Sequence, residues 1–351
     1  MSCRADRMER KIPVETWKIG SHTFDNPWIL APMAGVSERP YRVLALRHGA
    51  CAAPTELVSA KGLIFGQART ERYLARDEEV ENPFWVQIFG GDPEAMAKAA
   101  AHAAERGAAI LDINMGCPVK KVTRNGAGSA LLLDPDRVGL MIERMRAESG
   151  LPVTIKIRSG WDDDQVTALD IGRVAEQAGA ALVALHARTR AQGYSGYANW
   201  GLIKDLVDTI NIPVIGNGDA WNPDRARAMK AETGCAAVMI GRGALGNPWI
   251  FSKLSDPGFE PSPEARTALI LEHLDSHTAF VGDELRAVRR FRSHLSWYCT
   301  GLSGAAQFRR EIFLIDDLNE VKRRIDEFFM KSMPVAGGRE AIQDETTNAL
   351  G

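Results

Sequence analysis

The sequence has little that would assign it to a membrane, secreted or metal-binding class. No apolar run reaches the roughly 18 residues that a membrane-spanning helix needs, and the charged first residues lack the apolar core of a secretory signal. The five cysteines are scattered without a CxxC pair, which argues against a disulfide framework or a zinc site. The net charge of −2 gives no hint of a nucleic-acid partner, which only a local cluster of charge could indicate. We therefore expect a cytoplasmic protein with no metal ion, and nothing indicates a protein partner.

Short apolar runs alternate with helical segments through most of the chain. Runs of strand length occupy residues 27–33, 51–57, 84–90, 109–116, 152–160, 181–189, 213–219 and 236–244. Between them lie amphipathic segments such as 92–107 and 134–150, each of which begins with Asp-Pro. This alternation predicts a parallel sheet covered by helices. Eight units predict a closed (β/α)8 TIM barrel, and the first strand lacks the GxGxxG turn of a Rossmann fold.

The expected domain boundaries follow from this pattern. Residues 1–20 form an N-terminal segment, and residues 21–254 form the barrel. A Pro-rich linker begins at residue 255, and helical periodicity beyond it predicts a small all-helical C-terminal domain over 255–333. The Gly-, Asn- and Thr-rich residues 334–351 are expected to be disordered.

Polar residues recur at the carboxyl ends of the predicted strands, where TIM barrels place their active sites. They are Gln87, Asn114, Cys117, Lys156, Arg158, His186, Arg188, Asn217, Asp219 and Arg242. Unpaired, each would be costly in a barrel interior. Two Gly-rich turns, 216–219 and 241–248, follow the last two strands and are typical of a phosphate site. Glycines that only serve tight turns would explain one such turn, whereas two in succession favour a phosphate-bearing ligand.

Three side chains at this mouth carry possible chemistry. Lys156 could be a Schiff-base nucleophile, a general base, a cation beside a flavin ring, or half of a structural salt bridge. His186 could be a core histidine or a ligand contact. Cys117 lacks an identifiable His or Asn partner, so a proton-donor role is favoured over nucleophilic hydrolysis. Lys120 and Lys121 are expected to lower its pKa. The remaining cysteines in apolar settings are expected to serve packing: Cys51, Cys235 and Cys299.

Seven motifs, in order, resemble those of the tRNA-dihydrouridine synthases, bacterial B-type branch. They are "APMAGVSERPYR", "VQIFG", "DINMGCPVKKVTRNGAGSALL", "TIKIRSGW", "LHARTRAQGYSGYANW", "GNGD" and "GRGALGNPWIF". The resemblance covers about residues 20–330. It implies an FMN-bound barrel, a helical domain that helps hold tRNA, and NADPH as electron source. Specific D-loop uridines would become 5,6-dihydrouridine, with hydride passing from reduced FMN to C6 and a proton from Cys117 to C5.

The resemblance also implies roles for individual residues. Asn114 would lie by the substrate base as a second catalytic residue. FMN would contact Pro32, Met33, Ala34, Gln87, Lys156 and His186, and its phosphate would contact Asn217, Gly218, Asp219, Gly241 and Arg242. The chain departs from the family pattern at Ala187, Gly243, Leu245 and Ser293. The first three bear on the cofactor loops, and Ser293 removes a lysine charge from the expected RNA face.

An RNA surface is expected on the helical domain. Residues 285–310 contain six arginines and no acidic residue, and aromatic residues are interleaved with them. We expect tRNA contacts from Lys120, Lys121, Arg188, Arg289, Arg290 and Arg292. Two other functions stay open: a small-molecule flavin reductase of the dihydroorotate or dihydropyrimidine dehydrogenase type, and a non-catalytic tRNA-binding protein.

Overall fold

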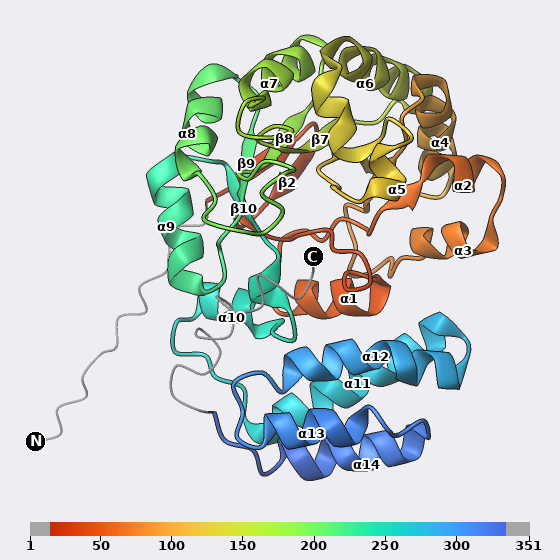
Figure 1. The fold of residues 1–351 in the computed structure, drawn as a ribbon, viewed down its shortest axis with the longest axis vertical. Helices are drawn as coiled ribbons and strands as arrows, with labels where there is room; N and C mark the ends of the chain where they lie inside the picture. Colours follow the sequence, from red (N-terminus) through yellow and green to blue (C-terminus); the bar gives the residue numbers. More distant parts are fainter. Residues whose placement is uncertain (1–14, 335–351) are drawn as a thin grey trace, which may run out of the picture.

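A computed structural model describes residues 15–334 of the chain. Eight parallel strands form one sheet in the order β3-β10-β9-β8-β7-β6-β5-β4. Their bounds are Trp28–Leu30 (β3), Val58–Ser59 (β4), Trp85–Phe89 (β5), Ile110–Met115 (β6), Val153–Arg158 (β7), Leu182–His186 (β8), Val214–Asn217 (β9) and Ala237–Ile240 (β10). Helices surround this sheet (Figure 1). The expected TIM barrel is confirmed, and the tail expected to be disordered lies, apart from its first residue, outside the described residues.

The barrel closes between β3 and the residues that precede β4. The backbone N–H of Leu30 donates to the carbonyl of Ala52 (3.0 Å), and the N–H of Cys51 donates to the carbonyl of Trp28 (2.8 Å). The strand predicted at 51–57 is therefore wrong in its bounds, because only residues 58–59 form a ladder. Pro54 lies inside the predicted run and has no N–H to donate, which accounts for the interruption.

Several barrel helices begin at Asp-Pro or Asn-Pro, the start signals that their sequences contain. The barrel helices are α1 (Arg39–Arg47), α2 (Ala60–Ile64), α3 (Ala68–Glu71), α4 (Pro93–Glu105), α5 (Lys120–Thr123), α6 (Pro135–Ser149), α7 (Ala168–Gln177), α8 (Trp200–Thr209), α9 (Pro223–Thr233) and α10 (Trp249–Ser255). Asp92, Asp134 and Asn222 each precede a proline and accept a hydrogen bond from the backbone N–H three residues later. These caps satisfy amide groups that the first helical turn leaves unpaired.

An N-terminal hairpin, which the sequence patterns did not predict, closes the opposite end of the barrel. Its strands are β1 (Trp17–Ile19) and β2 (His22–Phe24). Trp17, Ile19 and Phe24 form one buried cluster with residues at the starts of the strands, among them Trp85 and Ile110. The hairpin therefore plugs the amino-terminal end and leaves the carboxyl end as the mouth.

The C-terminal helices form a separate layer beneath α1 (Figure 1). They are α11 (Pro263–Val281), α12 (Glu284–Tyr298), α13 (Ala305–Ile312) and α14 (Leu318–Phe329). Their core is their own, although Leu44 and Trp249 of the barrel join it. Across residues 15–334, no helix is long and apolar enough to cross a membrane.

We predict that Trp17→Ala lowers the free energy of unfolding by about 3 kcal/mol, because it removes the large side chain that plugs the barrel. Lys18→Ala is the matched control, since this neighbour on the same strand is exposed; its effect should stay within about 0.5 kcal/mol. Urea unfolding measures both. Equal effects of the two substitutions would show that the hairpin does not stabilise the barrel.

Candidate active site

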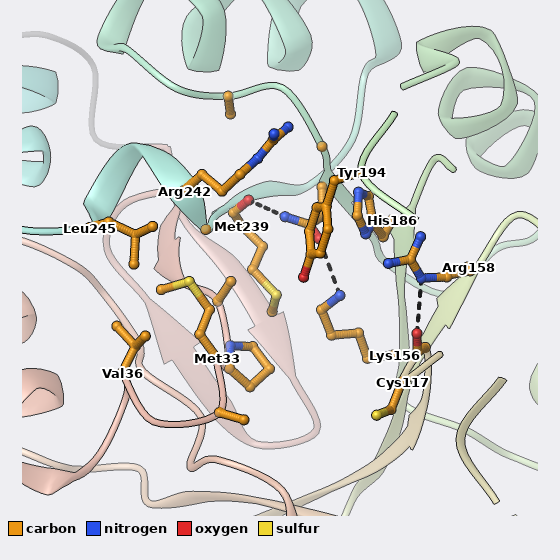
Figure 2. Close-up of a pocket in the computed structure, with 18 of the residues that line it drawn as sticks. Met33, Val36, Cys117, Lys156, Arg158, His186, Tyr194, Met239, Arg242 and Leu245 are labelled. Carbon is orange, nitrogen blue, oxygen red and sulfur yellow. Dashed lines mark hydrogen bonds between the residues drawn. The ribbon is translucent and has the colours of Figure 1, made fainter. Parts of the chain in front are cut away.

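The mouth of the barrel contains a cavity of about 360 Å³, a size typical of ligand sites. Apolar Met33, Val36 and Leu245 lie on one side, and polar Lys156 and His186 lie on the other (Figure 2). The expected cofactor and catalytic residues that line it are Pro32, Met33, Ala34, Asn114, Cys117, Lys156, His186, Asn217, Gly218, Asp219, Gly241 and Arg242. Side chains from strands far apart in the sequence thus meet in one place, as their positions at strand ends predicted.

Gln87 is the expected cofactor residue that does not line the cavity. Its amide nitrogen donates to Asp112 (2.7 Å), and its amide oxygen accepts from Asn114 Nδ2 (2.9 Å). The oxygen of Asn114 then accepts from the backbone N–H of Cys117 (3.0 Å). A chain of hydrogen bonds therefore runs from the barrel interior to the thiol-bearing turn and fixes the orientation of the Asn114 amide.

Burial raises the pKa of the Cys117 thiol, and it outweighs the opposing effects of the Val119 N–H and the Arg158 charge. The expectation that Lys120 and Lys121 lower this pKa is wrong, because both lie exposed on α5 and burial dominates. The thiol is therefore protonated at neutral pH. Such a group is suited to donate a proton and poorly suited to attack as a thiolate.

Lys156 lies on β7 with its ammonium in the cavity. Nζ donates to the amide oxygen of Asn217 (3.1 Å), whose own nitrogen donates to the carbonyl of Met239 (2.7 Å). Because this partner is a neutral amide, the salt-bridge interpretation of Lys156 is not supported. Burial, together with the charge of Arg158, lowers the pKa of Lys156 to about 8. The remaining N–H groups of this ammonium can donate hydrogen bonds to a ligand in the cavity.

His186 is a buried neutral ring beside the expected phosphate turn. Burial, reinforced by Arg158 and Lys156, holds its pKa well below the ordinary value. A Cβ on Gly218 would come within 3.1 Å of this ring and 2.7 Å of Ala198 Cβ, and Gly218 has φ +115°. Only glycine fits this position. The histidine is therefore packed against the turn rather than held in the apolar core.

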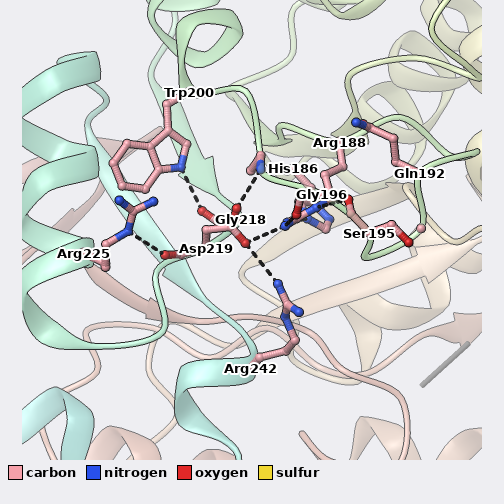
Figure 3. Close-up of polar contacts among 12 residues, drawn as sticks. His186, Arg188, Gln192, Ser195, Gly196, Trp200, Gly218, Asp219, Arg225 and Arg242 are labelled. Atoms are coloured by element: carbon pink, nitrogen blue, oxygen red, sulfur yellow. Dashed lines mark hydrogen bonds and ion pairs between the residues drawn. The ribbon is translucent and has the colours of Figure 1, made fainter. Parts of the chain in front are cut away.

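Asp219 connects the loops around the expected phosphate turn, residues 216–219, through its hydrogen bonds (Figure 3). One oxygen accepts from Arg188 (2.7 Å) and Arg242 (3.0 Å), and the other accepts from the Ala198 N–H (2.6 Å). The Asp219 backbone has φ 59°, an unusual conformation for a residue other than glycine. Its carboxylate thus holds two guanidinium groups and a loop, and it gives Arg242 a fixed place at the cavity.

The second Gly-rich turn, 241–248, closely approaches the residues that follow the first one, 216–219. A Cβ on Gly243 would lie 2.8 Å from the carbonyl oxygens of both Ala220 and Trp221. The glycine that departs from the family pattern at 243 therefore allows the two Gly-rich turns to touch. Ala187, another departure, is buried.

The four arginines expected to contact tRNA have partners within the chain. Arg188 is 1% exposed at its side chain and also donates to the carbonyls of Ser195 and Gly196. Arg289 and Arg292 both pair with Asp316, a residue just beyond the basic window. Arg290 pairs with Glu38 of the barrel. Of this set, Arg289 keeps an exposed side chain, as do Lys120 and Lys121 on α5.

Arg158, Tyr194 and Trp297 line the cavity without having been assigned a role from the sequence, although Arg158 was expected at the mouth. Arg158 donates to the carbonyls of Gly116 (2.9 Å), Thr189 (2.9 Å) and Gly193 (2.7 Å). Its position two residues after Lys156 places both on one strand face, so the spacing contained this signal. Tyr194, whose ring lies 5.6 Å from the Arg158 guanidinium, comes from a loop, and Trp297 comes from the helical domain. For these two aromatic residues no local pattern gave a signal.

The chain is similar to known proteins over most of its length. The family model described as dihydrouridine synthase (Dus) matches residues 29–333. The chain is 40% identical over 320 residues to tRNA-dihydrouridine synthase B of Pseudomonas aeruginosa, covering 89% of this chain and 95% of that protein. It is 39% identical over 319 residues to the enzyme of the same name from Vibrio cholerae, covering 89% and 98%.

Solved structures show the same fold at low sequence identity. A 2-naphthoyl-CoA reductase complex has a TM-score of 0.56 at 11% identity, covering 70% of this chain and 52% of that chain. The old yellow enzyme homologue from Zymomonas mobilis has a TM-score of 0.51 at 12% identity, covering 72% and 95%. These likenesses support the barrel architecture alone.

We predict a pH-dependent stability difference between the flavin-free protein and its Lys156→Met variant. The pKa of Lys156 falls from 10.5 to about 8 on folding, so the unfolded chain binds more protons between these values and wild-type stability rises with pH there. Relative to the variant, the gain should total at most about 3 kcal/mol and be absent below pH 7. Urea unfolding across pH 6–11 measures it. A difference that does not vary with pH would contradict the lowered pKa.

Proposed function

This chain belongs to the dihydrouridine synthase family, and we propose that it reduces specific uridines in the D-loop of tRNA to 5,6-dihydrouridine, with FMN as cofactor and NADPH as electron source. Membership makes the chain a flavin-dependent oxidoreductase that modifies tRNA. The observation that carries the finer proposal is the half-buried, protonated Cys117 thiol in the same cavity as Lys156 and His186.

The residues at the mouth fit FMN. Lys156 and His186 would hold the polar edge of the ring, and the apolar side that includes Met33 would cover it. The touching turns at 217–219 and 241–243 would receive the phosphate, with Arg242 as its cation. Lys156 has a neutral amide partner and so retains N–H groups for an electron-rich ring atom. A phosphate needs backbone N–H groups and a fixed cation, and the turns provide both.

When bound, reduced FMN supplies the hydride that C6 of the uracil accepts. Cys117 then donates the S–H proton to C5, so that one hydride and one proton saturate the C5–C6 double bond. The thiolate left behind regains a proton from water. Arg158, which three carbonyl groups hold in place, supplies a fixed positive charge near this thiolate. Asn114 would bind the base, because its amide is already oriented by Gln87.

The substrate base must leave its stack to enter a cavity of this depth. Lys120 and Lys121 lie exposed on α5, directly after the turn that bears Cys117, and suit phosphate contacts beside the mouth. Arg289 and Arg292 would contribute from α12, where RNA phosphates would compete with Asp316 for them. A flavin reductase for a free pyrimidine would need neither group of cations, and a non-catalytic tRNA-binding protein would not need the thiol.

We predict that Cys117→Ala retains FMN but reduces uridine in tRNA at least about 100-fold more slowly, because the proton donor is lost. Dihydrouridine formed from NADPH and tRNA measures the rate, and the flavin absorbance measures retention. NADPH should still reduce the flavin at the wild-type rate. Cys51→Ala, which removes a thiol outside the cavity, should leave turnover near wild type. Unchanged turnover in Cys117→Ala would rule out the general-acid role.

We predict that Arg289→Ala combined with Arg292→Ala weakens tRNA binding and flattens its salt dependence. Each lost phosphate contact should reduce the slope of log K against log salt concentration by roughly 0.7 to 0.9. Filter binding at several salt concentrations measures this slope. Arg323→Ala on α14 is the control, because Arg323 is also exposed and paired with carboxylates. If the double variant kept the slope of Arg323→Ala, the RNA face would lie elsewhere.

A further inference from the structure

The helical domain contacts two segments that shape the cavity. One is the turn between β3 and α1, from Met33 to Glu38, and the other is the turn after β10, from Arg242 to Gly246. Residues of both turns line the cavity, and so does Trp297 of α12. Helix α12 therefore belongs to the wall of the proposed flavin site as well as to the expected RNA face.

The first contact is made by Glu38, which is 2% exposed and directly precedes α1, without capping it through its side chain. It accepts from Arg290 of α12, and its second oxygen lies 3.3 Å from Nδ1 of His277 on α11. Burial on its own raises the pKa of Glu38, but the hydrogen bond from His277 and the charge of Arg290 overcome it, and the pKa is lowered. Glu38 is thus an ionised buried group whose cationic partner comes from the other domain.

The turn that precedes Glu38 is rigidly held. The N–H of Gly35 donates to Glu56, and the N–H of Met33 donates to Ser37 Oγ (2.8 Å). Arg42 donates to the carbonyl of Ser37 (3.2 Å). Because Ser37, the neighbour of Glu38, is bonded directly to Met33, a displacement of Glu38 would be passed to Met33 at the cavity. Glu38 is where the helical domain holds this turn.

The second contact joins α12 to the other turn. A Cβ on Gly246 would lie 2.3 Å from the backbone carbon of Trp297, so helix and turn are in backbone contact. Tyr41 of α1 donates its hydroxyl to the carbonyl of Ala244. Its ring lies 5.4 Å from His273 on α11 and 5.9 Å from His294 on α12. One aromatic side chain thus bridges α1, the β10 turn and the helical domain.

We infer that Arg290 is a positioning residue of the flavin site, which links engagement of the helical domain by tRNA to flavin binding through Glu38 and the Met33–Glu38 turn. This inference rests on the proposed function. Arg290 directs its guanidinium to a buried carboxylate of the barrel, whereas Arg289, one residue earlier, pairs with Asp316 at the surface. tRNA that presses α12 onto the barrel would stabilise the turn. By reciprocity, a linkage through which tRNA strengthens flavin binding is also one through which flavin strengthens tRNA binding.

The test is the rate of FMN release from the oxidised holoenzyme, with and without a saturating in-vitro-transcribed tRNA and without NADPH. Flavin fluorescence on release gives the rate. In the wild type, tRNA should slow release at least about 5-fold, the lower end of typical couplings. In Arg290→Gln and in Glu38→Gln this ratio should fall to near 1. The double variant Glu38→Gln/Arg290→Gln should give the same ratio as either single variant, because all three remove one ion pair.

Arg289→Ala is the matched control on the same helix. It should weaken tRNA binding, yet at saturating tRNA it should keep the wild-type ratio of release rates. If Arg290→Gln does not fold because it leaves a buried charge unpaired, the double variant, which removes both charges, provides the measurement. A ratio at the wild-type value in the folded variant would overturn the inference.

Failure of the inference and failure of the proposed function give different results. A wild-type protein that cannot bind FMN would overturn the proposed function and this inference with it. A wild-type protein that holds FMN and releases it equally fast with and without tRNA would overturn the inference alone.

Discussion

The backbone hydrogen bonds between β3 and residues 51–52 close the parallel sheet, and the site depends on this closure. In a closed parallel barrel the carboxyl ends of all strands meet at one mouth. The N-terminal hairpin fills the other end with Trp17 and Phe24. Polar groups below the mouth, such as Gln87 and Asp112, are hydrogen-bonded to one another, and the groups that could meet a ligand gather at the mouth. That is where Lys156, His186 and Asn217 lie.

The charged groups at the mouth are buried, except for the half-buried Arg242, and each has a partner that limits the cost. Asp219 holds Arg188 and Arg242, and three carbonyl groups hold Arg158. Lys156 differs from these groups, since its partner is the amide of Asn217. Asp112 beneath it, whose pKa burial raises to about 6, does not bond to it directly. The site thus concentrates positive charge where an electron-rich ring and a phosphate would bind.

Sequence reasoning located the site because strand ends and period-two spacing are local patterns. Lys156, Arg158 and Asn217 were placed at the mouth in this way, although Arg158 was given no role there. Such reasoning could not find Tyr194, Trp297 or Glu38, whose roles come from contacts between distant segments. The absence of acidic residues from 285–310 was also misleading. Asp316 lies beyond this window in the sequence, but in the structure it pairs with Arg289 and Arg292. The strand at 51–57 was misplaced because its apolar pattern took no account of Pro54.

In the proposed mechanism, the position of Cys117 would meet two opposing demands on a proton donor. Before the reaction the thiol must keep its proton, and burial ensures this by raising its pKa. As the proton leaves, the developing thiolate must be stabilised, and Arg158 is near enough to lower that cost. Exposed lysines such as Lys120 would do this less well, because water screens their charge and their side chains are mobile. A cation fixed by three carbonyls changes neither its position nor its charge during the transfer, so its stabilisation needs no reorganisation.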